Sequence, residues 1–350
     1  MRFVEHSIYR SLCKAVLNGM VDVSVIIPAY NERRHISRCL DSLLRQNFDS
    51  IEVLVVDDGS TDGTAEIVKK YLAAYPGRFR LVRLRRNTGS GNARNIGALY
   101  ARGRVVVFLD ADMEFPPTFL SSLVGPILDG ISQSTCPSAE IIANIDNPWV
   151  MVQGQRIRGV GSEERTGFVR AIERELFIRS GGFDASFGYF DDQTLHRKTG
   201  ITSLVVKDAV IYHHNPDTAR EILWRNFWMG RSVLRLHKPR EVAVMTVKRL
   251  LDLSALAALF LILTGSLPQQ VIGVALLATF ALAIARHRVL ETGSISKRLL
   301  VKLFYTPVYR FLKAAGFIGG LLYSLAGRDW ARIEPVEQSE LTKYVTEFSA

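Results

Sequence analysis

The alternation of two residue patterns between positions 23 and 109 constrains the fold of this chain more than any other feature. Four apolar runs, three of them rich in β-branched residues, predict buried strands, because they are too short for surface helices. They lie at 23–27, 51–56, 79–84 and 105–109. Three longer stretches between these runs predict helices. They cover 32–46, 65–75 and 90–101. Such alternation produces right-handed crossovers, so the predicted fold class is α/β, with a mainly parallel sheet covered by helices on both faces.

Acidic residues follow two of the predicted strands. Ligands of open parallel sheets bind past the carboxyl ends of the strands. Asp110 and Asp112, two positions apart after the run 105–109, can close on one divalent cation that also holds a diphosphate. The alternative to a cation site is that Asp110 and Asp112 form only a polar turn after the strand. Asp58 follows the second strand and is available to contact a base, because Asp62 can cap the next helix.

Three further positions carry candidate chemistry. Arg94 stands where a dinucleotide-binding fingerprint has its third glycine, so it can meet a nucleotide or its diphosphate, or pair with a nearby Asp. Asp191 and Asp192 form either a solvated acidic turn or a general base that takes a proton from an attacking hydroxyl. His213 follows an apolar run and is either structural or a further metal ligand.

The last third of the chain changes in composition. The run 250–267 is apolar except for Asp252, and the run 271–285 is apolar throughout. Both are near the lower end of the roughly 17–25 residues that span a bilayer, so we expect a membrane hairpin over 250–285. Basic residues flank it, which predicts a catalytic part facing the cytoplasm. The stretch 299–326 fits an interfacial or embedded helix, and 329–350 reads as a polar tail.

Charge and cysteine content limit the class of partner and compartment. A net charge of +10 suits an anionic partner, and its position beside apolar runs favours a membrane surface over a nucleic acid, for which no binding signature is present. The three cysteines are far apart and lack a CxxC motif, so no disulfide framework or zinc site is expected. Residues 1–20 carry charges throughout and do not resemble a signal peptide.

Four ordered motifs in the first third of the chain point to a known family. They are Val23-Ser-Val-Ile-Ile-Pro-Ala-Tyr-Asn-Glu32, Val55-Val-Asp-Asp-Gly-Ser-Thr-Asp62, Asn87-x-Gly89 with Ala93-Arg-Asn-x-Gly97, and Phe108-Leu-Asp-Ala-Asp112. With these motifs the chain resembles a family 2 glycosyltransferase of the GT-A fold. The resemblance covers roughly residues 21–216. We expect a catalytic domain over 21–240, with a nucleotide-binding half at 21–115 and an acceptor half at 116–240. The composition places membrane-associated helices at 241–328 and an N-terminal extension at 1–20.

The resemblance also implies roles for single residues. Pro28, Tyr30 and Glu32 would line the nucleotide pocket, and Asp58 would contact the base of a UDP- or GDP-sugar. The segment Asp110-Ala111-Asp112 would hold the donor diphosphate and Mg²⁺ or Mn²⁺, with His213 as a possible extra ligand and Arg94 near the nucleotide.

The family's catalytic base lies in an acidic motif after Gly-Gly-Phe-Asp, which is found here at 181–184. Asp192 is the best match to this base, with Asp191 beside it, although Thr194 stands where a second acid is usual. No Gln-x-x-Arg-Trp motif precedes the apolar runs, which favours a single-addition enzyme over a processive synthase. The implied function is inverting, metal-dependent sugar transfer to a hydroxyl of a membrane-located or lipid-linked acceptor. A synthase that glycosylates a polyprenyl phosphate, similar to dolichyl-phosphate-sugar synthases, and a non-catalytic nucleotide-sugar-binding membrane protein are the alternatives.

Overall fold

The computed structural model describes residues 21–153, 156–157, 164–275, 297–327, 340 and 342–349. The N-terminal extension predicted at 1–20 lies outside these residues, as does most of the apolar run 271–285.

The described elements follow the predicted alternation in the first part of the chain. The strands are β1 (Val23–Ala29), β2 (Ile51–Asp57), β3 (Phe79–Leu84), β4 (Val105–Phe108), β5 (Met113–Glu114), β6 (Ser134–Ile142), β7 (Arg156–Ile157), β8 (Arg165–Thr166), β9 (Ala171–Glu173), β10 (Ser203–His213) and β11 (Val345–Ser349). The helices are α2 (Ile36–Leu44), α3 (Thr64–Ala74), α4 (Ser90–Tyr100), α5 (Phe119–Leu128), α6 (Pro148–Met151), α7 (Arg174–Arg179), α8 (Thr194–Thr199), α9 (Ala219–Leu236), α10 (Pro239–Thr264) and α12 (Lys297–Leu325). Two 3₁₀ helices, η1 (Ala185–Gln193) and η2 (Thr342–Tyr344), complete this set, and residues 267–275 are also helical.

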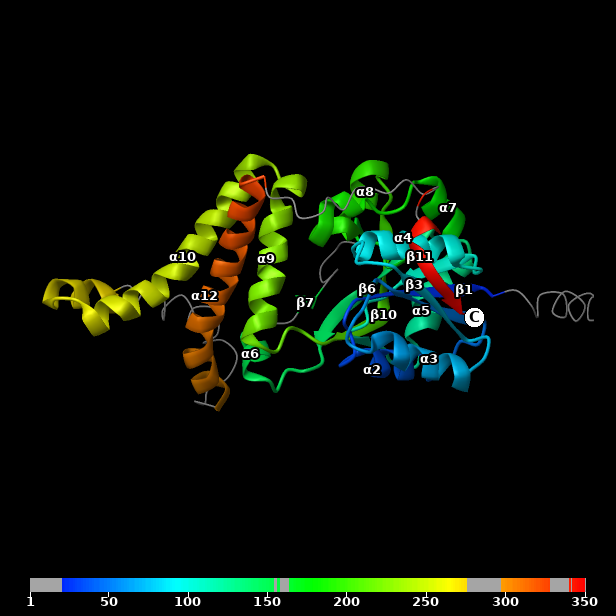
Figure 1. Ribbon diagram of the computed structural model, residues 1–350, viewed down its shortest axis with the longest axis horizontal. Coiled ribbons are helices and arrows are strands. Elements are labelled where there is room, and N and C mark those ends of the chain that lie inside the picture. The colour runs from blue at the N-terminus through cyan, green and yellow to red at the C-terminus, as the bar shows by residue number, and fades with distance from the viewer. Residues whose placement is uncertain are drawn as a thin grey trace, which may run out of the picture. The chain divides into compact units, whose positions relative to one another are not determined.

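The strands form one mixed sheet in the order β11-β3-β2-β1-β4-β9-β6-β10-β5, with β7 beside β6 and β8 beside β10 (Figure 1). The neighbours β3, β2, β1 and β4 are parallel, as predicted. Beyond β4 the sheet continues with antiparallel pairs, such as β4 with β9 and β9 with β6. The expectation of a mainly parallel sheet is therefore correct only for the first half of the fold. The second half adds its strands without a helical crossover between each pair.

Helices cover both faces of the sheet and bury two apolar clusters (Figure 1). On one face, α2, α3 and α5 pack against side chains such as Val25, Val53 and Val107. On the other face, α4 and α7 pack against alternate residues of the same strands, among them Ile26. These strands are buried on both faces, as their continuous apolar runs predict. Of the described cysteines, Cys39 and Cys136 are buried free thiols.

β1 extends beyond the predicted run 23–27 and continues through Pro28 to Ala29. The Ile26 carbonyl accepts from Leu109 N–H (3.1 Å), and the Ala29 carbonyl accepts from Asp58 N–H (2.8 Å). Because successive residues face opposite neighbours, the Pro28 nitrogen faces the β4 side, and pairing with β4 ends at Ile26. The missing N–H therefore costs no ladder hydrogen bond.

The apolar residues around Trp149 form the short helix α6 and not a strand. Pro148 occupies the first turn of this helix, and the Asn147 side chain accepts from Trp149 N–H (2.9 Å). The preceding strand, β6, contains Pro137.

The chain divides into two compact units. The first contains residues 1–141, 156–213 and 333–350, and the second contains 142–155 and 214–332. Helix α9, predicted as part of the catalytic domain, thus belongs to the second unit. In the segment predicted as a polar tail, β11 pairs with β3 in the first unit.

In the second unit, the described part of the predicted membrane hairpin contains no spanning helix. No helix within the described ranges combines the length and the apolar character needed to cross a bilayer. The first predicted span lies in α10, which begins at Pro239 and ends at Thr264. Asp252 lies within this helix and pairs with Arg249 (3.1 Å) and with Arg310 of α12 (3.6 Å).

Candidate active site

The polar strand ends meet where the strand order reverses direction. β1 lies between β2 and β4, and all three are parallel, so the residues after each strand emerge at the same edge of the sheet. This is the topological switch point at which open α/β sheets bind ligands. The loops after these three strands carry Tyr30, Asp58 and Asp112, the positions that the sequence predicts to share one site.

Hydrogen bonds join the loop after β1 to the loop after β2. Asn31 donates its N–H to Ser60 Oγ (2.9 Å), and its Oδ1 accepts from Thr61 N–H (2.9 Å). Its φ of 58° is left-handed, a conformation that asparagine adopts more readily than most residues. The N–H of Glu32 donates to Thr64 Oγ1 (2.9 Å). The two loops are therefore held as one surface.

The predicted pocket residues of the first loop lie on this surface. Tyr30, at the end of β1, is 48% exposed, so its ring is accessible to a ligand. Glu32 is half-buried. Burial raises the pKa of the Cys39 thiol, and the charges of Asp112, Asp110 and Glu32 raise it further. Cys39 Sγ donates to the Asp110 carbonyl (3.7 Å), so this thiol lies beside the loop after β4.

Asp58 is buried, with 3% of its surface exposed, and it holds the next loop along the sheet. Its carboxylate accepts from Thr88 N–H (2.7 Å), Thr88 Oγ1 (2.9 Å) and Gly89 N–H (2.8 Å). Burial raises the pKa of Asp58 to about 7, although these three donors act in the opposite direction. The adjacent Gly59 has a φ of 79°, and a Cβ there would lie 2.9 Å from the Arg86 backbone. The contact between Asp58 and a nucleotide base stays a prediction. In the structure, the Asp58 carboxylate holds Thr88 and Gly89 in the loop after β3.

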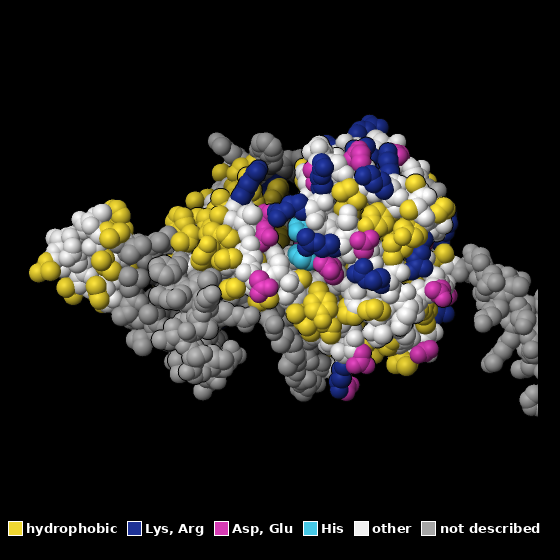
Figure 2. Space-filling view, turned by 90° about the horizontal axis from the view of Figure 1, so that it is seen from below, with side chains coloured by type: hydrophobic (Ala, Val, Ile, Leu, Met, Phe, Trp, Pro, Cys, Tyr) yellow, Lys and Arg dark blue, Asp and Glu magenta, His cyan; other side chains and the backbone are white. Residues whose placement is uncertain are grey.

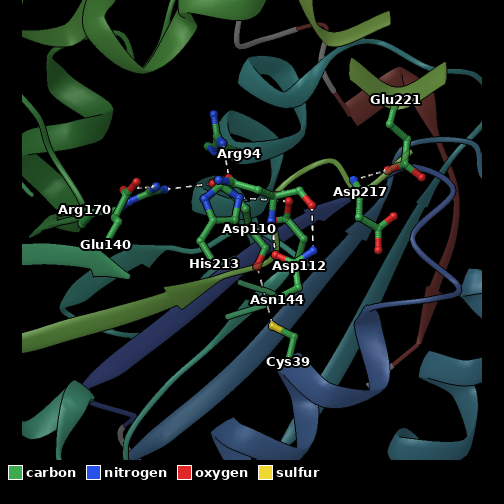
Figure 3. Close-up of polar contacts among 11 residues, drawn as sticks. Cys39, Arg94, Asp110, Asp112, Glu140, Asn144, Arg170, His213, Asp217 and Glu221 are labelled. Atoms are coloured by element: carbon green, nitrogen blue, oxygen red, sulfur yellow. Dashed lines mark hydrogen bonds and ion pairs between the residues drawn. The ribbon is translucent and has the colours of Figure 1, made fainter. Parts of the chain in front are cut away.

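Asp110 is held by two buried arginines (Figure 3). Arg94 Nη2 lies 2.6 Å from Asp110 Oδ1, and Arg170 Nη1 lies 3.2 Å from Oδ2. Arg170 also pairs with the buried Glu140 through Nη2 (3.3 Å). Burial alone would raise the pKa of Asp110, but Arg170 and Arg94 lower it well below its usual range. Arg94 was expected either to meet a nucleotide or to pair with a nearby aspartate, and the structure shows the pair with Asp110. Both carboxylate oxygens of Asp110 take part in ion pairs.

Asp112 lies beside His213, with 3.0 Å between Oδ2 and Nε2 (Figure 3). His213 ends β10 and is paired in register with Met113, which brings it next to the loop after β4. Burial lowers the pKa of His213, but the charge and hydrogen bond of Asp112, together with the charges of Asp110 and Glu140, raise it, and the net shift is upward. Ala111, between the two aspartates, is buried.

The Asp112 and His213 side chains fit a divalent cation that is shared with a substrate. Carboxylate oxygen and imidazole nitrogen are both ligands for Mn²⁺, and Mg²⁺ is often bound by one or two carboxylates together with substrate phosphates. No cluster of three or more acidic, histidine or cysteine side chains suited to a metal is found among the described residues. Asp112 and His213 are thus the described side chains that would hold such an ion.

The segment Gly181-Gly-Phe-Asp184 is fixed against α4. Asn95 Nδ2 donates to the Phe183 carbonyl (2.8 Å), and Asn95 Oδ1 accepts from Phe183 N–H (2.9 Å). A Cβ on Gly182 would lie 2.4 Å from Asn95 Oδ1, so glycine is needed for this approach. Thr194, at the expected place of a second acid, is buried and accepts from Asp184 N–H through Oγ1 (2.9 Å). Its role is to shape this turn.

The predicted base, Asp192, lies on η1 and is half-buried. The Asp191 side chain lies outside the described residues.

Arg170 and Glu140 are site residues that the sequence analysis missed. The available signal was a charged residue inside an apolar run, as in Phe168-Val-Arg-Ala-Ile172. Such a residue is expected to have a buried partner, but the sequence does not show which one.

The chain is similar to several known proteins. Residues 24–191 match the model of the family described as Glycosyl transferase family 2. An uncharacterized glycosyltransferase, YibD of Escherichia coli K12, is 34% identical over 147 residues, which are 42% of this chain and 42% of YibD. The succinoglycan biosynthesis protein ExoO of Rhizobium meliloti is 42% identical over 180 residues, which are 49% of this chain and 47% of ExoO. The chain thus spans less than half the length of both relatives.

A solved structure shares the fold. The mannosyltransferase PcManGT from Pyrobaculum calidifontis, in complex with GDP-Man and Mn²⁺, superposes with a TM-score of 0.53 and 24% sequence identity, covering 89% of this chain and 88% of that one. The first unit therefore has a mixed α/β architecture of the GT-A type.

Proposed function

We propose that this chain, whose residues 24–191 form a glycosyl transferase family 2 domain, is a metal-dependent inverting glycosyltransferase. It transfers a sugar from a nucleotide-diphosphate donor to a hydroxyl of a membrane-located or lipid-linked acceptor. Tyr30 and Asp58 contact the nucleotide, and the loop after β4 meets the diphosphate.

The distribution of charge around Asp110 supports this proposal most strongly. The buried guanidinium groups of Arg94 and Arg170 are already balanced by Asp110 and Glu140. This cluster therefore offers no uncompensated positive charge to a diphosphate. A divalent cation on the neighbouring Asp112 would supply that charge.

Mg²⁺ or Mn²⁺ bound by Asp112 and His213 would neutralise the departing nucleotide diphosphate. We expect Mn²⁺ to strengthen the binding of GDP or UDP to the wild type. D112A should remove this Mn²⁺-dependent part of the affinity, as measured by calorimetry. D208A is the matched control, because Asp208 is an exposed carboxylate on the same strand as His213. Equal Mn²⁺ dependence in D112A and the wild type would contradict the metal role.

Asp192 acts as the general base that takes the proton from the acceptor hydroxyl. D192N should lower transfer to a polyprenyl-diphosphate-linked sugar by about 10²- to 10⁴-fold. It should leave the Kd for the nucleotide unchanged. The Pyrobaculum neighbour holds GDP-Man and Mn²⁺, so this donor and this ion are the first to be tried, before other GDP- and UDP-sugars.

A polyprenyl phosphate acceptor would give a different result, because a phosphate is already ionised near neutral pH and needs no base. Transfer to polyprenyl phosphate that survives in D192N would assign the alternative activity, glycosylation of a polyprenyl phosphate. Full turnover of D192N with the lipid-linked sugar would contradict the role of Asp192. Nucleotide-sugar binding without transfer or donor hydrolysis would assign the non-catalytic alternative.

The second unit binds the surface of a membrane, and the catalytic part faces the cytoplasm. Large hydrophobic side chains gather on its helices (Figure 2), among them Phe260 (66% exposed), Leu263 (73%) and Leu267 (75%). Exposed apolar area of this kind marks protein or membrane contacts. The protein should co-sediment with vesicles that contain anionic lipids. Replacing these three residues by Ser should release it, and unchanged co-sedimentation would contradict the proposal.

A further inference from the structure

The strand β11 brings the end of the chain to the edge of the sheet where the donor site lies. It runs antiparallel to β3, with Val345 opposite Leu84 and Ser349 opposite Leu81. The start of β11 is therefore at the carboxyl end of β3, and ligands of parallel sheets bind past the carboxyl ends of the strands. Tyr344, the last residue of η2, directly precedes β11. This tyrosine thus lies beside the loop that leads from β3 to α4.

Tyr344 contacts this loop through both its backbone and its side chain. Its carbonyl accepts from Arg85 N–H (3.0 Å), and the guanidinium carbon of Arg86 lies 5.5 Å from the centre of its ring. A guanidinium at this distance from an aromatic ring is attracted to it. Tyr344 is half-buried and Arg86 is exposed. The ring therefore restrains a side chain that is otherwise surrounded by solvent.

The other end of the loop is fixed to Asp58. The Asp58 carboxylate accepts from Thr88 N–H (2.7 Å) and from Gly89 N–H (2.8 Å). Between these two anchors, the backbone of Arg86 packs against Gly59, since a Cβ on Gly59 would lie 2.9 Å from the Arg86 carbonyl carbon. A displacement of Arg86 therefore changes the packing against the residue that follows Asp58.

We propose that Tyr344 is a positioning residue of the donor site, which holds the loop 85–89 against Asp58 by means of the Arg86 guanidinium. This inference rests on the proposed function, in which Asp58 contacts the nucleotide. Tyr344 acts through Arg86 and takes no part in the chemical step. Its removal should therefore weaken nucleotide binding and leave kcat unchanged.

The ring of Phe348 provides a matched control on the same strand. Its centre lies 4.8 Å from the guanidinium carbon of Arg80, so it makes the same kind of contact as Tyr344. Arg80 is the second residue of β3 and pairs with Glu52, the second residue of β2 (2.7 Å). This contact therefore lies toward the amino ends of the parallel strands, away from the donor edge. F348L tests what the loss of such a contact does to β11 alone.

Y344L removes the aromatic ring but keeps an apolar side chain and the backbone hydrogen bond to Arg85. The affinity can fall by no more than the contact favours the held loop, so the Kd for GDP or UDP with Mn²⁺ should rise about two- to fivefold. Calorimetry measures this Kd. Y344F keeps the ring and should bind as the wild type does. F348L should lower the Tm without changing the Kd.

A double-mutant cycle tests whether Tyr344 acts through Arg86. If it does, Y344L has no further effect once the guanidinium is gone, and Y344L/R86M should bind GDP or UDP as R86M does. Additive losses in the double variant would contradict the proposed route through Arg86.

Amide hydrogen exchange without nucleotide tests the positioning of the loop independently of the proposed function. Peptides that contain residues 85–89 should exchange faster in Y344L than in the wild type, and at the wild-type rate in Y344F and F348L. Unchanged exchange in Y344L, an unchanged Kd in Y344L, or an equal loss of affinity in F348L would each overturn the inference. If the wild type binds no nucleotide, the proposed function fails, and the exchange rates alone decide whether Tyr344 holds the loop.

Discussion

Asp58 is buried, and burial disfavours the charged form of its carboxylate. Its carboxylate accepts three hydrogen bonds that hold Thr88 and Gly89, yet burial raises its pKa to about 7. In the unfolded chain the same group has a pKa of about 3.9. The folded state therefore binds a proton more tightly than the unfolded state does.

This difference predicts a pH dependence of stability. The contribution of Asp58 is fully present below its unfolded pKa and is lost as the pH rises through about 7. Relative to D58N, which does not titrate, the free energy of unfolding of the wild type should fall by roughly 3–4 kcal/mol between pH 4 and pH 8. Urea unfolding of both proteins across this range measures the difference. A constant difference would show that the two states bind the proton equally.

The hydrogen bond between Asp184 and Thr194 gives a second testable prediction. The Thr194 hydroxyl accepts from the N–H of Asp184, and this bond joins the first residue of α8 to the residue that precedes η1. T194V leaves that N–H without its partner and should lower the free energy of unfolding by about 1–3 kcal/mol. T194S keeps the hydroxyl and should stay near the wild type. Equal stability of T194V and T194S, measured by thermal unfolding, would show that this hydrogen bond is not needed.

Among the helices, the pair α9 and α12 depends on glycine. A Cβ on Gly320 would lie 2.0 Å from the Phe227 carbonyl oxygen, and a Cβ on Gly230 would lie 1.9 Å from the Phe317 carbonyl oxygen. The two backbones therefore approach more closely than any larger residue permits. Gly319, next in sequence to Gly320, differs, because the nearest atom to its Cβ would be a ring carbon of Phe227 at 3.8 Å.

Adjacent substitutions in α12 test this packing. G320A should destabilise the second unit by about 1–3 kcal/mol, because the helices must separate or shift. G319A should be neutral or stabilising by up to about 1 kcal/mol, because alanine favours a helix and has room here. Thermal unfolding followed by circular dichroism compares the two. A similar loss in both variants would show that helix propensity, not packing, determines the effect.

In the whole molecule, residues distant in sequence complete the sheet of the first unit. β11 pairs antiparallel with β3, Glu347 forms an ion pair with Lys69 (3.0 Å), and Phe348 lies 4.8 Å from the Arg80 guanidinium. Thr346 Oγ1 also donates to the Arg83 carbonyl (3.1 Å). The strand therefore covers what would otherwise be the open edge of the parallel sheet.

Removal of this strand should expose that edge. A chain that stops after Glu340 should unfold at a lower temperature than the full chain and should self-associate, because an uncovered edge pairs with other chains. Calorimetry and light scattering measure the two effects. Removal of Ala350 alone leaves β11 intact and serves as the control. A truncated chain that stays monodisperse with an unchanged Tm would assign no stabilising role to β11.

The arrangement of the donor loops could be predicted from the sequence because alternation of strands and helices determines which strand ends share an edge. Tyr30, Asp58 and Asp112 follow parallel strands that are neighbours, as expected. The contacts of Arg170 could not be predicted, since they depend on β9 and β6 joining the sheet in the antiparallel direction. No periodicity in the second half of the fold indicates that direction.

The position of β11 has a consequence for biosynthesis. Residues 345–349 leave the ribosome after the whole of the second unit, yet they belong to the sheet that residue 23 begins. During translation the sheet of the first unit therefore lacks its edge strand β11 until the helices of the second unit have been synthesised. Over that interval the backbone groups of β3 that pair with β11 have no strand beside them.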